Sequence, residues 1–195
     1  TKKPSQAQVG KLLQDVLARN IETADALPIV KALVEVGGGD PCWTGGYGDT
    51  LLHYASWYCS AEVLRYLVSM GADPHAKDCT RNLPAHWAAH GNVSGVQYYV
   101  GEVGIHPDTP GYKQRTLLHY AASSTSWSAP DVVGYLVVNA GCSLTATDEV
   151  GYIGESSAVA CSCWPGLTPS TVLHWQYGKT PQDLVSPRFV MVNQF

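Results

Sequence analysis

A repeat of about 33 residues is the feature that most constrains how this chain can fold. Three related segments carry a histidine at the same place, and the spacing between these histidines is the same both times: His53, His86 and His119. A second motif, a turn that ends in proline, recurs with that same spacing: Pro41, Pro74 and Pro107. A constant period of this length is typical of an array in which each unit stacks on its neighbours. We therefore predict a single elongated domain over residues 1–195.

The unit that begins near Gly48 predicts two helices. Thr50 is a residue type that favours the start of a helix, and the apolar residues at 51, 52 and 55 have the spacing of one buried helical stripe. Apolar residues over 63–68 predict a second helix with a broader buried face, and Gly71 can take the left-handed conformation that ends it. Pro74 then keeps the chain extended. The unit is helix, loop, helix and turn, which predicts an all-α fold.

These segments resemble the ankyrin repeat. The strings GDTLLHYA (48–55) and GADP (71–74) are similar to that family's pattern, whose hallmark is a T-P-L-H-x-A tract near the start of each unit. Two copies have leucine in the proline position, and the copy at 83–88 keeps proline but lacks threonine. The resemblance covers about 29–148. It implies a solenoid of about five helix-loop-helix units with short β-turn fingers, in which each histidine ties adjacent turns by hydrogen bonds.

The predicted units are roughly 5–44, 45–77, 78–110, 111–147 and 148–195. The first lacks the T-P-L-H tract, so we expect atypical capping repeats at both ends of the array. The fourth has a widened loop over 123–130. In the last unit the string GKTPQDL (178–184) resembles a repeat opening, which makes 149–177 an insertion. A second degenerate unit within that insertion, around 172–175, is the alternative.

Composition and charge disfavour several classes of partner. The formal net charge is -4, 14% of the residues are charged, and no Lys/Arg cluster occurs, so neither nucleic acid nor an anionic membrane is an expected partner. No apolar run approaches the roughly 20 residues that span a bilayer. The six cysteines occupy unmatched places in the units, which favours free thiols and a cytoplasmic location, with the nucleus as the alternative. We expect a monomer.

The sequence predicts neither a metal site nor a catalytic site. Neighbouring units of packed helices lie about 10 Å apart, so the three repeated histidines cannot share a zinc ion, whose ligands lie about 2 Å away. Cys161 and Cys163 with His174 form only a weak metal motif. No nucleophile elbow, Walker loop, dinucleotide fingerprint or zincin motif occurs. We therefore expect no cofactor and no enzyme activity.

The resemblance implies that a partner lies on the concave face, across the finger tips and the ends of the first helices. Tyr54, Trp87 and Tyr120 follow the repeated histidines and are expected to pack between helices. Variable tips and exposed aromatic residues are the expected contacts, because such rings bury a large area at low entropic cost. The candidate binding residues are Tyr47, Asp49, Trp57, Tyr58, Arg81, Asn82, His90, Lys113, Arg115 and Trp127.

The predicted function is that of a protein-interaction module, a scaffold or adaptor that binds a protein or peptide. One alternative is a recognition domain excised from a larger enzyme or channel. Another is a methyl-lysine peptide reader, in which Trp57 and Trp127 form an aromatic cage; no acidic residue is expected beside that cage. The identity of the partner does not follow from the sequence.

Overall fold

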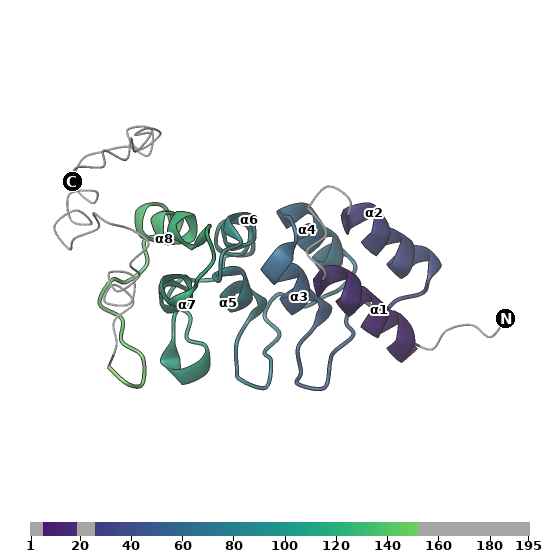
Figure 1. Cartoon of the computed structure of the whole chain (residues 1–195), viewed down its shortest axis with the longest axis horizontal. Helices are drawn as coiled ribbons and strands as arrows, with labels where there is room; N and C mark the ends of the chain where they lie inside the picture. Colours follow the sequence, from purple (N-terminus) through teal and green to yellow (C-terminus); the bar gives the residue numbers. More distant parts are fainter. Residues whose placement is uncertain (1–5, 19–25, 152–195) are drawn as a thin grey trace, which may run out of the picture.

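The computed structural model describes residues 6–18 and 26–151, and these form two rows of helices (Figure 1). One row consists of α1 (Gln6–Ala18), α3 (Leu51–Tyr58), α5 (Pro84–Ala88) and α7 (Leu117–Ser123). The other consists of α2 (Ala26–Lys31), α4 (Ala61–Ser69), α6 (Val93–Gln97) and α8 (Ala129–Val138). Short π-helices continue two of them, η1 (Ala32–Val36) after α2 and η2 (Tyr98–Val103) after α6, and the 3-10 turn η3 (Tyr112–Gln114) precedes α7. The described ranges contain no named strand, which confirms the all-α prediction.

The two rows pack on each other along their whole length. In the first row α3 contacts both α1 and α5, and α5 contacts α7; in the second row α4 contacts α2 and α6, and α6 contacts α8. One continuous hydrophobic core runs between the rows, from Val9 to Cys142. Leu51 and Leu52 of α3 and Leu64 and Leu67 of α4 are fully buried in it, as the apolar spacing predicts. The helices therefore form a stacked array.

A histidine completes the start of each first-row helix from α3 onward. The backbone N–H of Thr50 donates to Nδ1 of His53 over 3.1 Å, and the Thr50 hydroxyl lies 2.9 Å from the same nitrogen. Thr116 and His119 repeat this arrangement, with an N–H to Nδ1 distance of 3.2 Å. The backbone N–H of Leu83 donates to Nδ1 of His86 over 3.0 Å. Each imidazole thus satisfies a donor that the helix leaves unpaired.

The other ring nitrogen bonds to the loop that precedes the next first-row helix. Because Nδ1 accepts a backbone N–H, the proton of the neutral imidazole is on Nε2, which can then donate. His53 Nε2 donates to the carbonyl oxygen of Asn82 over 3.1 Å, and His86 Nε2 donates to the carbonyl oxygen of Thr109 over 3.0 Å. For these two histidines the tie between adjacent turns that the resemblance implied is confirmed.

Polar side chains make a second set of links at the opposite ends of the first-row helices. Asn92 Nδ2 donates to the carbonyl oxygens of Ser56 and Cys59, over 2.8 and 2.7 Å. Ser124 Oγ donates to the carbonyl oxygen of His90 over 2.5 Å, and Ser128 Oγ donates to that of Gly91 over 2.6 Å. Neighbouring units are therefore held together at both ends of α5.

The loops that precede α3, α5 and α7 project as fingers from the same side of the array (Figure 1). Adjacent fingers are hydrogen-bonded, since Cys79 N donates to the Tyr47 carbonyl over 2.8 Å. The tip position recurs once in each of these units and is left-handed each time, with φ of 73° at Gly48, 68° at Arg81 and 60° at Gln114. A side chain in this conformation costs about 1 kcal/mol. Of these three fingers, only the first has glycine at this position, the residue type that adopts the left-handed conformation without strain.

Most predicted elements are present where the periodicity places them, with two differences. α5 ends at Ala88, so His90 lies beyond the helix and not at its last residue. The second-row helices of the first and third units change to π-helix in η1 and η2, which apolar spacing does not predict. The widened loop lies between α7 and α8. The predicted insertion at 149–177 and the repeat opening at 178–184 lie outside the described residues, except for 149–151.

We expect the stability of the array to fall as the pH is lowered from about 6.5 to about 4. His86 is completely buried, and burial lowers its pKa from 6.5 to about 4. Over that interval the unfolded chain binds a proton at this residue that the folded chain excludes. The free energy of unfolding therefore falls by roughly 3 kcal/mol on account of this residue. Urea unfolding at a series of pH values measures it.

The matched variants are His86→Gln and His75→Gln, because His75 is exposed. His86→Gln should be less stable at pH 7 and should show a shallower pH dependence than the unmodified chain. His75→Gln should leave the pH dependence unchanged. An unaltered slope in His86→Gln contradicts the assignment.

Candidate functional site

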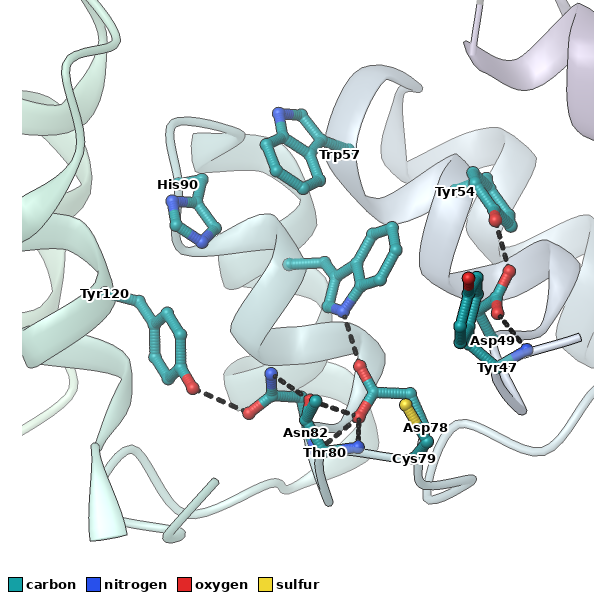
Figure 2. Close-up of a pocket in the computed structure, with 11 residues that line it drawn as sticks. Tyr47, Asp49, Tyr54, Trp57, Asp78, Cys79, Thr80, Asn82, His90 and Tyr120 are labelled. Atoms are coloured by element: carbon teal, nitrogen blue, oxygen red, sulfur yellow. Dashed lines mark hydrogen bonds between the residues drawn. The ribbon is translucent and has the colours of Figure 1, made fainter. Parts of the chain in front are cut away.

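A hollow of about 340 Å³ opens on the finger side of α3, α5 and α7 (Figure 2). We call it the ring pocket, because six of the side chains around it carry aromatic rings. Its lining residues are Tyr47, Asp49, Tyr54, Trp57, Asp78, Cys79, Thr80, Asn82, Trp87, His90 and Tyr120. This volume is within the range of pockets that hold small ligands or single side chains.

The positions of these rings are determined by the stacking of one unit on the next. Trp87 of α5 meets Trp57 of α3 edge to face, with ring centroids 5.3 Å apart and an angle of 89° between the planes. It meets Tyr54 in the same way at 5.4 Å and 72°. Trp57 also stacks flat against His90, at 4.9 Å and 4°, and His90 meets Tyr120 at 5.4 Å and 72°. Perpendicular and parallel pairs of this kind fix ring orientations.

Two carboxylates lie beneath the rings. Asp78 accepts hydrogen bonds from the backbone N–H groups of Thr80 and Asn82, from the Thr80 hydroxyl and from the Trp87 indole, over 2.6 to 3.1 Å. Asp49 accepts the backbone N–H of Tyr47 over 3.2 Å and the Tyr54 hydroxyl. Asp49 is 4% and Asp78 is 8% exposed. These bonds hold the finger turns and the rings in one framework.

In the part of the chain that the structure describes, no cation is paired with these carboxylates. Burial alone would raise the pKa of Asp78, but the hydrogen bonds from Thr80, Asn82 and Trp87 together outweigh burial and lower the pKa. Asp78 is therefore ionised at neutral pH. Within 6–18 and 26–151, neither Asp49 nor Asp78 forms an ion pair. Burial lowers the pKa of His90, so the His90 ring is neutral at neutral pH and does not offset the charge of the carboxylates. The ring pocket is negative overall.

A second hollow of about 390 Å³ adjoins the ring pocket. It shares Trp57 and His90 with the ring pocket, and its other wall is formed by residues with hydroxyl side chains at the end of α7 and in the loop after it: Ser123, Ser124, Thr125 and Ser126. We call it the serine hollow. None of its described lining residues carries a charged side chain at neutral pH. The stacked Trp57 and His90 rings therefore form the boundary between a negative hollow and a neutral one.

The predicted binding residues divide into two groups. Five of them line the ring pocket: Tyr47, Asp49, Trp57, Asn82 and His90. The others lie outside it: Tyr58 stacks beside Trp57 at 5.9 Å, Arg81 is exposed at a finger tip, Lys113 lies over the Tyr112 ring, Arg115 donates to Asp148 over 3.3 Å, and Trp127 is 89% exposed.

The arrangement differs from the aromatic cage considered from the sequence. Trp127 lines neither hollow, so it does not face Trp57 across either of them. Trp57 is instead flanked by Trp87 and His90. The expectation that no acidic residue lies near Trp57 is wrong, because Asp49 and Asp78 line the same pocket. The chain folds so that residues from three units meet, which spacing along one unit does not reveal.

Several lining residues were not among the predicted contacts: Tyr54, Asp78, Cys79, Thr80, Trp87 and Tyr120. Sequence reasoning gave the three aromatic residues of this set a packing role. A signal was present nonetheless. Tyr54 and Trp57 are three residues apart on one helix face, and Trp87 and His90 occupy the same two positions of the next unit. Two ring pairs at the repeat spacing indicate rings that meet between units.

Comparison with known proteins bears on what such a site does. The model of the ankyrin repeat matches residues 47–79 and 113–149. These two segments are ankyrin repeats. Ankyrin repeats are generally protein–protein interaction modules and are typically non-catalytic. A search of curated proteins found no match.

The ring pocket combines matched and unmatched parts of the ankyrin-repeat array. Trp57 and Tyr120 lie in segments that match the family, whereas Trp87 and His90 lie in the segment between them that does not. That segment nonetheless forms α5 and keeps the His86 tie to its neighbour. Within the described ranges, no helix has the length and apolar character needed to cross a membrane.

We expect Asp78→Ala to destabilise the array by about 3 kcal/mol, because it leaves several half-buried donors of the finger and the Trp87 indole without an acceptor. Asp73→Ala is the matched control, since Asp73 is exposed and its carboxylate accepts the backbone N–H of His75, over 2.8 Å. That variant should lose less than about 1 kcal/mol. Urea unfolding measures both, and equal losses would contradict the structural role given to Asp78.

Proposed function

We propose that the chain binds a protein partner through the finger tips and the first-row helix ends, on the face that carries the ring pocket. The observation that supports this is the convergence of exposed aromatic side chains on that pocket. Tyr47 is 77% and Trp57 40% exposed, although both lie beside a framework of half-buried hydrogen bonds. Such rings are ordered before a partner arrives, so binding costs little conformational entropy.

The two adjoining hollows favour an extended segment of the partner. The ring pocket and the serine hollow share the stacked rings of Trp57 and His90, and a peptide that crosses these rings can place one side chain in each hollow. The hydroxyl groups of the serine hollow suit hydrogen bonds to a peptide backbone. Trp57 is then the central contact, which is where the largest energetic contributions of an interface are found.

The remaining features of the proposal follow from the repeat pattern. We propose a single domain of about five units with atypical caps at 5–44 and 148–195, acting as a monomeric, non-catalytic scaffold. The thiols support a reducing compartment such as the cytoplasm: Cys42, Cys59, Cys79 and Cys142 are free, and burial raises the pKa of Cys59 and Cys142 to about 12. Protonated, buried thiols of this kind are unreactive.

Peptides selected by the whole chain from a random peptide library test the proposed face. Trp57→Ala combined with Arg81→Gly should weaken binding of a selected peptide by about 30-fold or more, as loss of an interface hot spot does. Glycine suits the left-handed tip at 81, so this replacement removes the charge without adding strain. Fluorescence anisotropy with a labelled peptide gives the dissociation constants.

Trp127→Ala is the matched control, because it removes an exposed tryptophan outside both hollows. It should leave the affinity unchanged. The melting temperature of each variant should stay within a few degrees of that of the unmodified chain. If the double variant binds as tightly as the unmodified chain, the proposed face is wrong.

A further inference from the structure

We propose that the ring pocket holds an arginine side chain of the partner, and this inference rests on the proposed function of that face. Three independent features of the pocket support it. They are the charge of two buried carboxylates, the direction of the hydrogen bonds in the polar wall, and the stacked parallel rings of Trp57 and His90.

The first feature is the charge. Asp49 and Asp78 are almost completely buried, yet the donors that the described residues direct at their carboxylates are all neutral. A buried carboxylate normally has a cationic partner, because removing its charge from water is costly. Among the residues that the structure describes, no Lys or Arg side chain lines the ring pocket. A cation bound above these carboxylates gains from an electrostatic field that no neighbouring protein cation in the described ranges offsets.

The second feature is the direction of the donors in the wall. The Tyr54 hydroxyl donates to Asp49, the Tyr120 hydroxyl donates to Asn82 Oδ1 over 2.6 Å, and the Trp87 indole donates to Asp78 (Figure 2). These hydrogens point into the protein, and the Thr80 hydroxyl likewise donates to Asp78. The oxygen lone pairs that remain can only accept. The pocket therefore complements a ligand with several donors, and guanidinium carries five.

The third feature is the stack of parallel rings. Trp57 and His90 stack with their centroids 4.9 Å apart and an angle of only 4° between their planes, and Trp57 is 40% exposed. A planar guanidinium can extend a stack of parallel rings and is attracted to the face of an aromatic ring. His90 is neutral, so it does not repel the cation. The perpendicular Trp87 ring closes one side of the site.

These features distinguish arginine from other cationic side chains. Methylation of a lysine removes N–H donors, so a trimethylated lysine would leave the acceptors of the wall unpaired. An unmodified ammonium is strongly hydrated and cannot stack. Citrulline has nearly the shape of arginine but no charge. Comparing the two therefore shows how much of the affinity depends on the charge and how much on the shape.

Amino-acid derivatives test the inference without a partner protein. The 15N-labelled whole chain is titrated with N-acetyl amides of arginine, citrulline, lysine and trimethyllysine, while the indole N–H signals are followed by NMR. The arginine derivative should shift the Trp57 and Trp87 signals, and each of the other three should bind at least about tenfold more weakly. Trp57→Leu should weaken arginine binding to a similar extent. Trp127→Leu is the matched control and should not.

Each contrary result has a definite meaning. Equal binding of citrulline or lysine, tighter binding of trimethyllysine, or an unchanged affinity in Trp57→Leu overturns the arginine assignment. Arginine-to-citrulline replacement in a library-selected peptide separates the two proposals. If Trp57→Ala weakens binding of that peptide but replacement of its arginine by citrulline does not, the proposed face is right and the arginine inference is wrong. If the arginine amide binds but no selected peptide depends on Trp57, the proposed function of this face fails.

Discussion

The array depends on neutral imidazoles that each bond in two directions. In the units of His53 and His86, one ring nitrogen accepts the backbone N–H at the start of a helix, and the other donates to a carbonyl of the next turn. Protonation would place a hydrogen between Nδ1 and the backbone N–H that it accepts. These bonds fix the start of each helix against the loop that follows it.

The ring pocket is a consequence of the repeat spacing. Tyr54 and Trp57 belong to α3, whereas Trp87 and His90 hold the same positions one unit later. When the units stack, rings with the same register come to lie about 5 Å apart and settle into edge-to-face and parallel pairs. The site is therefore built from the same contacts that hold the array together.

Asp78 connects the framework to the site. Its carboxylate fixes the finger at Thr80 and Asn82 and orients the Trp87 indole, and the same charge faces an open pocket. Asp49 does the same for the neighbouring finger and Tyr54. An uncompensated buried charge lowers the stability of the free chain, and a cationic partner would recover that cost on binding. Asp49 and Asp78 thus contribute both to the stability of the fingers and to the proposed recognition of a cation.

The sequence by itself determined the helices, their starting residues and the repeat, because apolar periodicity, capping preference and a constant repeat length can all be read along the chain. It also singled out Trp57 and His90 as candidate contacts. Only the tertiary structure decided which rings meet, that Arg115 is tied to Asp148, and that Trp127 lies apart from Trp57. These depend on how residues of different units lie after stacking, and that arrangement is a sum of many weak contacts that no single segment encodes.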